Sequence, residues 1–552
     1  MTILLYLLFN LFLFLLFRGL IVSTKIYSKR EILVDDIQIC GLPLHLFYPV
    51  LALFFIGNIS VLFNFFIPVK NLNFFWLILF LILLVVNFKE PISIKNKTFL
   101  AASLLIIPAI IAISSYGLKF HFDTIDTHLN FQFWLRESKV VFGLTNLYIV
   151  YGWSNIYEYI LANFWYKNSF LGLHFVNIVF FTFFYNFIFY NLAFSRSLFL
   201  KFLSLNITLY SFLDNFGING GANGFVNIQM VGKPDEAVGI MFFISFVIFL
   251  NDYLKNNFTK NNFLFLCTIS LFTFQLKIFG GLLIIPLIIY LLKLKKQRFT
   301  KNQLIYFLSL IFLTITYFLK NLIISGCLIF PIKQTCFVNL SWSNSEYVEK
   351  LSTRVMFENN AFRIRYNFYE WFDNWINSGY NFQVYSNFLI SLIFILIFNL
   401  LFFKKNKNQL SINEMVSYLL IVLIVLTFFV TGPQLRYGFG MFLIVISSYS
   451  IKEKHARNVN YFQKLIYVSY FILFLSIGLT PRLYSYKGFL ANPTKVAVIE
   501  DSTNEYLNFS VLKNLEIKNV AGSICYIPKS CIRNEKYKSI TYKEKYGYKF
   551  YE

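Results

Sequence analysis

The stretch "NLNFFWLILFLILLVVNF" runs from Asn71 to Phe88 and contains 18 residues without one charged side chain. A helix of about 20 mainly apolar residues is long enough to cross the hydrocarbon core of a bilayer. This stretch therefore predicts a membrane-spanning helix.

The same pattern recurs along the chain, which is 57% hydrophobic and only 14% charged, compared with about 25% charged in an average soluble domain. The run from Asn262 to Leu292 is too long for one span, and "KIFGG" interrupts it, so it predicts two short helices. With these two we expect an all-α polytopic membrane protein of about 14 spans, within a range of 12 to 14. The other predicted spans lie near 2–22, 42–67, 71–88, 98–115, 169–194, 199–213, 237–251, 303–320, 386–403, 411–430, 436–451 and 462–480.

Basic loops indicate the orientation, because Lys and Arg are retained on the cytoplasmic side of a membrane. The loops "KLKKQRFTK", "KKNKN" and "KEKHAR" fall on one side of the predicted topology. Both termini are then extracytoplasmic, and the first apolar run stays as an anchor. We expect a transmembrane domain over 1–480, with outer loops at 116–168 and 321–385, and an extracytoplasmic tail over 481–552.

Charge and cysteine placement fit this topology. The net charge of +23 is spread over the cytoplasmic loops and the tail, which does not favour a nucleic-acid partner. Disulfides persist outside the cytosol, and four cysteines fall in predicted outer segments. They suggest the pairs Cys525–Cys531 and Cys327–Cys336, with four free thiols as the alternative.

Polar residues gather in "HFDTIDTHLNFQFWLRE", which covers 121–137 and directly follows the fourth predicted span. Asp123 and Asp126 should therefore lie near the outer membrane surface. A carboxylate there can accept the proton of an acceptor hydroxyl, or it can cap a helix. The aromatic residues of 127–135 favour an interfacial helix. Trp134 and Glu137 are candidates for substrate binding.

Charged residues next to other predicted spans are further candidates. A lysine within apolar sequence, such as Lys277, can hold a phosphate or snorkel to the membrane surface. Asp235 opens a predicted span, where the helix dipole also favours an acid, and Arg436 opens another. Neither a Walker loop, nor a Gly-x-Ser-x-Gly elbow, nor a histidine metal motif occurs in the sequence. Acidic residues of the outer loops could ligate Mg or Mn, but no metal site is assigned.

Three islands of sequence resemble a group of bacterial membrane proteins encoded with surface-polysaccharide genes. In that group, an Asp-Thr, a His and a Trp precede Gly-Leu-x-Asn-Leu in the first outer loop. The other two islands are "SGCLIFPIKQTCFVNLSWS" from Ser325 and "GSICYIPKSC" in the tail. The matching residues of the first island are Asp126 or Asp123, His128, Trp134, Gly143, Leu144, Asn146 and Leu147.

This group in turn resembles the GT-C superfamily of integral-membrane glycosyltransferases. The resemblance implies a bacterial inner-membrane enzyme that uses a polyprenyl-phosphate-linked sugar at the extracytoplasmic face, with an essential acid in the first outer loop. Asp123 or Asp126 would take that role, and Lys277 and Arg436 would stabilise the departing phosphate. The implied partners are a lipid-linked sugar donor, a glycan acceptor and membrane lipid. The alternatives are an O-antigen or capsule polymerase and a flippase or transporter of lipid-linked sugar.

Overall fold

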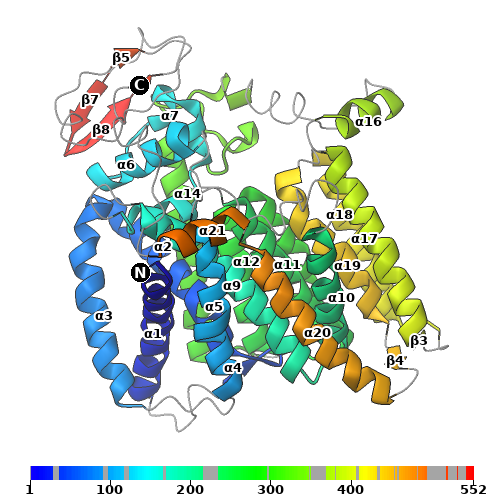
Figure 1. Cartoon of the computed structure of the whole chain (residues 1–552). Coiled ribbons are helices and arrows are strands. Elements are labelled where there is room, and N and C mark those ends of the chain that lie inside the picture. Colours follow the sequence, from blue (N-terminus) through cyan, green and yellow to red (C-terminus); the bar gives the residue numbers. More distant parts are fainter. Residues whose placement is uncertain are drawn as a thin grey trace.

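The computed structural model is a bundle of long helices (Figure 1). It describes residues 2–28, 37–90, 97–116, 124–165, 170–215, 234–294, 298–346, 348–349, 368–378, 381–405, 409–431, 435–452, 454–456, 459–481, 483–493, 518–519, 531–532 and 542–551.

Nine helical segments of this described part are long and apolar enough to cross a membrane, which confirms the prediction of a multi-span helical protein. One of them joins α4 and α5 through the π-helical turn η4 (Ala102–Ile106). The helices that make up the nine segments are α1 (Thr2–Ser28), α2 (Tyr48–Asn64), α3 (Leu72–Phe88), α4 (Lys97–Ala101) with α5 (Ile107–Ala112), α9 (Leu171–Phe194), α11 (Asp235–Leu254), α14 (Lys301–Ser325), α17 (Asn381–Phe402) and α18 (Ile412–Thr431).

The five remaining predicted spans also form helices, which are shorter or less apolar. The helix is interrupted at Lys277, between α12 and the 3-10 helix η8 (Ile278–Leu283). The backbone of Lys277 is extended, as the "KIFGG" interruption predicts. The count of 14 spans and their orientation stay predictions. The helices at these positions are α10 (Leu198–Asn215), α12 (Lys260–Leu276), α13 (Ile284–Lys293), α19 (Leu435–Ile451) and α20 (Val459–Leu479).

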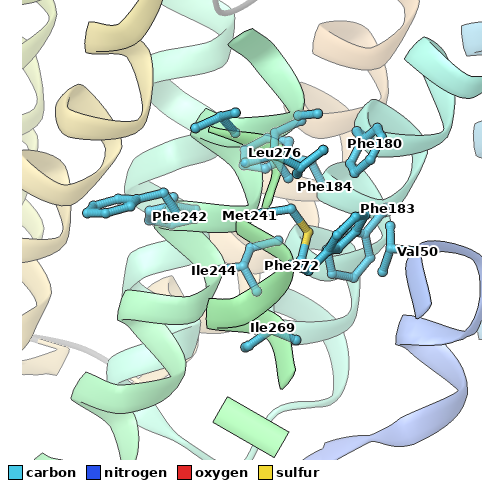
Figure 2. Packing of buried hydrophobic residues seen from close by; sticks show 14 of the residues in the cluster. Val50, Phe180, Phe183, Phe184, Met241, Phe242, Ile244, Ile269, Phe272 and Leu276 are labelled. Atoms are coloured by element: carbon cyan, nitrogen blue, oxygen red, sulfur yellow. The ribbon is translucent and has the colours of Figure 1, made fainter. Parts of the chain in front are cut away.

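Burial separates central helices from peripheral ones. The apolar windows of α9 and α11 are 89% and 94% buried, whereas those of α3 and α18 are 22% and 28% buried. Aromatic side chains fill the centre. The ring centroid of Phe272 on α12 lies 5.4 Å from that of Phe54 on α2 and 6.2 Å from that of Phe180 on α9. Figure 2 shows Phe180 and Phe272 in this core. The peripheral helices instead expose large apolar side chains. Such surfaces avoid water, so they suit contact with lipid.

The two ends of the bundle differ. Helices α6 (Leu129–Glu137), α7 (Leu144–Leu147) and α16 (Phe368–Ile376) lie at one end, together with the tail strands β7 (Tyr542–Lys545) and β8 (Tyr548–Tyr551) (Figure 1). At the opposite end, β3 (Phe403–Lys405) pairs antiparallel with β4 (Lys454–Ala456). We call the first the loop end. The remaining short elements are the β1–β2 pair (Gln38–Ile39, Leu42–Pro43), the β5–β6 pair (Lys518–Asn519, Cys531–Ile532) and α21 (Leu483–Ala491).

The C-terminal strand β8 docks on the first loop. Phe142 exchanges two backbone hydrogen bonds with it, one from Tyr551 N at 3.0 Å and one to Lys549 O at 2.9 Å. The side-chain amide of Asn146 donates to Tyr551 O at 2.8 Å. Gly143 permits this approach because its φ is +67°, and a Cβ there would collide with the Tyr551 carbonyl. The end of the tail and the first loop therefore form one packed unit.

Candidate functional site

Several predicted site residues cannot be placed at the level of their side chains. Asp123 and Cys525 lie outside the described residues. Asp126 lies on the π-helical turn η6 (Thr124–His128), Arg436 on the first turn of α19 and Cys531 in β6, but their side chains are outside the described part. The roles of these five residues stay predictions.

His128 makes the central contact of the first loop. It ends η6, and its Nδ1 contacts Oε1 of Glu158, which lies on α8 (Ile156–Ala162). The histidine side chain is 23% exposed, whereas that of Glu158 is 3% exposed. The second Glu158 oxygen accepts a hydrogen bond from Gln132 Nε2 at 2.6 Å, and the Gln132 carbonyl oxygen accepts one from Trp165 Nε1 at 2.7 Å. Glu158 is thus a buried acid that holds a partly exposed histidine.

The local sequence explains why Glu158 is placed so firmly. Asn155 is the N-cap of α8, and its side-chain oxygen accepts the Glu158 backbone N–H at 3.1 Å. An acid in the first turn is also stabilised by the helix dipole. The cap and the dipole therefore both fix Glu158 at the start of α8.

Lys277 and Asp235, which were separate predictions, meet in the structure. Lys277 Nζ lies 2.5 Å from Asp235 Oδ1, across the break between α12 and η8. Asp235 begins α11 and its side chain is 4% exposed, whereas that of Lys277 is 25% exposed. A buried carboxylate needs such a partner to offset its desolvation.

Acids of both pairs act electrostatically on Tyr157 of α8. Burial, followed by the negative charges of Glu236, Glu158 and Asp235, raises the pKa of the Tyr157 phenol well above its ordinary value. These charges and the burial favour the protonated phenol. Hydrogen bonds place the two segments side by side, because the Tyr317 hydroxyl lies 3.4 Å from Ser154 O, just before α8, and 3.2 Å from Gln275 O, two residues before Lys277. We call His128, Tyr157, Glu158, Asp235 and Lys277 the polar centre.

Lys320 of α14 is a buried lysine that the sequence-based predictions do not include. Its side chain is fully buried, and its Nζ donates to the backbone oxygen of Ser154 at 2.8 Å and to Ser154 Oγ at 2.6 Å. The Tyr317 ring centroid lies 4.3 Å from the same nitrogen, and the Tyr317 hydroxyl donates to Gln275 O at 3.2 Å. Lys320 thus ties α14 to the residue before the α8 N-cap.

Neither Lys320 nor Glu158 was among the predicted site residues, although the sequence marks both. Lys320 stands in the apolar run "TYFLKNLII", and Glu158 stands in "SNIYEYILA". The rule that selected Lys277, a charge within apolar sequence, also applies to them.

Trp134 and Glu137, the other two substrate-binding candidates, contact different parts of the protein, and their binding roles stay predictions. Trp134 is buried, with Tyr551 edge-on at 6.1 Å and Lys549 Nζ at 5.5 Å from its ring centroid. Glu137 pairs with Lys70 at 2.6 Å on a partly exposed surface. The helix predicted within 127–135 is present as α6, but Phe131 and the other aromatic side chains of α6 are buried within the protein and do not face the headgroup zone. The position of α6 relative to the membrane stays a prediction.

The cysteines divide into one disulfide-bonded pair and two free thiols among the described residues. Cys327 and Cys336 form a disulfide bond in the second large loop, while Cys40 and Cys267 are free. Among the residues whose structure is described, no group of three or more His, Cys, Asp or Glu side chains could hold a metal ion.

These features define a multi-pass α-helical membrane protein with a charged centre at the loop end of its bundle. The family model described as Domain of unknown function (DUF8201) matches residues 1–443, so the chain belongs to this family. The match includes the whole polar centre and ends within α19. No curated protein and no solved structure matches the chain.

Proposed function

We propose that this protein is a membrane glycosyltransferase that moves a sugar from a polyprenyl-phosphate carrier to a surface glycan at the extracytoplasmic face of the bacterial inner membrane. The observation that carries the proposal is the polar centre, in which a histidine held by a buried acid lies near a lysine–aspartate pair. A base and a cation are the two groups that transfer from a lipid phosphate requires.

His128 is suited to act on the acceptor. The contact with Glu158 holds the ring at Nδ1, and the side chain is 23% exposed, so a substrate hydroxyl can approach the ring from the exposed side. Histidine changes its charge near neutral pH, which makes it an effective general base. Asp126 lies on the same turn as His128, and Asp126 or Asp123 is the alternative base, as the GT-C resemblance implies.

Lys277 is suited to act on the donor. A phosphate oxygen accepts strong hydrogen bonds from a lysine ammonium group. Asp235 balances the lysine charge while no substrate is bound, and the partial exposure of Lys277 leaves a side from which a phosphate can approach. The pair thus provides a cation at the buried start of α11 without a large net charge.

Arg436 is a second candidate cation because of how α19 packs on α11. A Cβ at Gly440 of α19 would lie 2.9 Å from the backbone oxygen of Gly239 of α11, so the two backbones are in close contact. Each helix begins about one turn before this contact, at Leu435 and Asp235. Arg436 therefore lies in the first turn of α19, and this turn is next to the first turn of α11, which contains Asp235.

In the proposed reaction, the acceptor hydroxyl gives its proton to His128 or Asp126, and its oxygen attacks the anomeric carbon of the donor sugar. The bond from that carbon to the phosphate oxygen breaks, and the electron pair leaves with the lipid phosphate. Lys277 stabilises the charge that develops on this oxygen. The products are the glycosylated acceptor and polyprenyl phosphate.

The test uses a host strain whose surface glycan changes when the gene is deleted. His128→Gln, Glu158→Gln and Lys277→Met should each fail to restore the glycan while membrane levels of the protein hold. Lys333→Met is the matched control, because Lys333 forms an exposed ion pair with Glu349. If all three site variants restore the glycan as the control does, the transferase proposal fails. Release of polyprenyl phosphate in proteoliposomes separates transfer from transport, which would leave the lipid-linked sugar intact.

A further inference from the structure

Helix α16 (Phe368–Ile376) lies at the loop end beside the ends of α17 and α18 (Figure 1). Two tryptophans attach it to the bundle. Trp375 is buried, and its ring centroid lies 4.8 Å from that of Tyr385 on α17 and 5.8 Å from that of Phe429 on α18. Trp371 stacks on Trp375 at 5.7 Å with an angle of 9° between the rings. The position of α16 relative to the two helices is therefore well defined.

The rest of the α16 surface divides into two faces. Successive residues of a helix are turned by about 100°, from 3.6 residues per turn. Tyr369 and Phe372 therefore share one face with Ile376, next to the buried tryptophans. Tyr369 is 78% and Phe372 is 42% exposed. The arc on the other side of Tyr369 carries exposed polar residues and begins about 40° from Tyr369, at Asp373. These residues are Glu370, Asp373, Asn374 and Asn377 just past the helix end.

The two helices that Trp375 contacts also expose apolar side chains. On α17, Phe382 and Leu389 are 58% and 57% exposed, and on α18, Leu426 is 54% exposed. These helices are candidate membrane spans, so their exposed side chains suit lipid. A helix with one aromatic face and one polar face favours the boundary between headgroups and acyl chains.

We propose that α16 lies in the headgroup zone of the bilayer leaflet at the loop end. Tyr369, Phe372 and Ile376 face the acyl chains, while Glu370 and Asp373 face water. This lipid contact rests on the membrane placement of α17 and α18 and not on the proposed sugar transfer.

The length of α17 agrees with this placement. Its 22 residues span about 33 Å at about 1.5 Å per residue, close to the ~30 Å hydrocarbon core of a bilayer. With α16 at one interface, β3 falls at the other, and β3 contains Lys404 and Lys405. Lysines are common at the cytoplasmic surface, so both ends of α17 fit one membrane position.

The charge of α16 defines the lipid chemistry. The helix carries two acids and no basic residue, in contrast to the basic helices that bind anionic lipid. Insertion should therefore depend on the aromatic face alone. We expect the same depth in phosphatidylcholine and in a mixture with phosphatidylglycerol.

The experiment places a spin label on the full-length protein in nanodiscs of these two compositions. A genetically encoded reactive amino acid at position 369, 372, 370 or 373 carries the label, so the native cysteines stay in place. Labels at 369 and 372 should be more accessible to oxygen, which concentrates in the bilayer, and those at 370 and 373 to a water-soluble nickel complex. Equal nickel access at 372 and 373 would overturn the proposal. Shielding of 372 from both reagents would also overturn it, and would indicate a protein partner or a second copy.

Discussion

Replacing Gly143 by alanine should release the C-terminal strand from the first loop. The new Cβ would lie inside contact distance of the Tyr551 carbonyl and 2.8 Å from Trp342 Cβ. The Tyr551 oxygen is a backbone atom, and Trp342 Cβ is bonded directly to the backbone, so neither can turn aside as a side-chain tip can. The strand must therefore move. The φ of +67° also disfavours alanine, because L-residues strain in the left-handed region.

The magnitude follows from the contacts that would be lost. Two backbone hydrogen bonds link Phe142 to β8, and a third runs from Asn146 to Tyr551. Each contributes about 0.5–1.5 kcal/mol, so their loss lowers the local opening free energy by about 3 kcal/mol. Because about 1.4 kcal/mol is tenfold in an equilibrium constant, amide exchange in β8 should accelerate by roughly 100-fold.

Hydrogen–deuterium exchange of the peptide that covers 542–551 measures this change. Gly41→Ala is the matched control, since Gly41 has a φ of +75° but nothing within 4 Å of the added Cβ. It carries the backbone strain without the collision, and should leave exchange in β8 unchanged. If Gly143→Ala leaves β8 as protected as Gly41→Ala does, the docking of β8 on Gly143 is refuted.

Three further predictions concern the buried polar groups. Lys320→Met should lower the melting temperature in detergent, because it removes both hydrogen bonds to Ser154 at about 0.5–1.5 kcal/mol each; an unchanged melting curve would contradict this. Lys277→Met should destabilise the protein more than the double replacement with Asp235→Asn, since the single change leaves a buried carboxylate without its lysine; equal melting temperatures would disprove the coupling. The raised pKa of Tyr157 means that only the unfolded state releases this proton above pH about 10. Stability should therefore fall as pH rises beyond that value, and Tyr157→Phe should weaken the fall in a pH series of thermal melts.

The sequence predicts the helices well because apolar length is a local property. The span at 71–88 corresponds to α3 (Leu72–Phe88), and the predicted interruption of the 262–292 run occurs at Lys277. Both follow from the chain's own composition, without knowledge of its neighbours.

The polar centre could be predicted only in part, because it depends on contacts between distant segments. His128 and Glu158 come from two helical elements 30 residues apart, and Lys277 and Asp235 are 42 residues apart. The sequence marks each lysine or acid as costly within apolar surroundings, but it does not say which pairs meet.

The burial of the short aromatic helices could not be predicted from the sequence either. Both α6 and α16 are short and aromatic, and their sequences alone do not separate them. The structure buries Trp134 of α6 beneath Tyr551 and Lys549, whereas Tyr369 of α16 stays exposed. Strand β8 covers α6 and comes more than 400 residues later in the chain. A local sequence pattern cannot reveal such a contact.

The two ends of α11 show that a buried acid does not by itself indicate a functional site. Asp252, near its end, is fully buried, and its Oδ2 accepts from Asn262 of α12 at 2.9 Å and from Tyr290 of α13 at 3.0 Å. These neutral donors join three helices, and Lys255 adds a Coulombic attraction to the same carboxylate. Asp235, at the start of the same helix, instead pairs with the partly exposed Lys277. A substrate phosphate can compete for a lysine held this way, so the start of α11 is the end at which we expect chemistry.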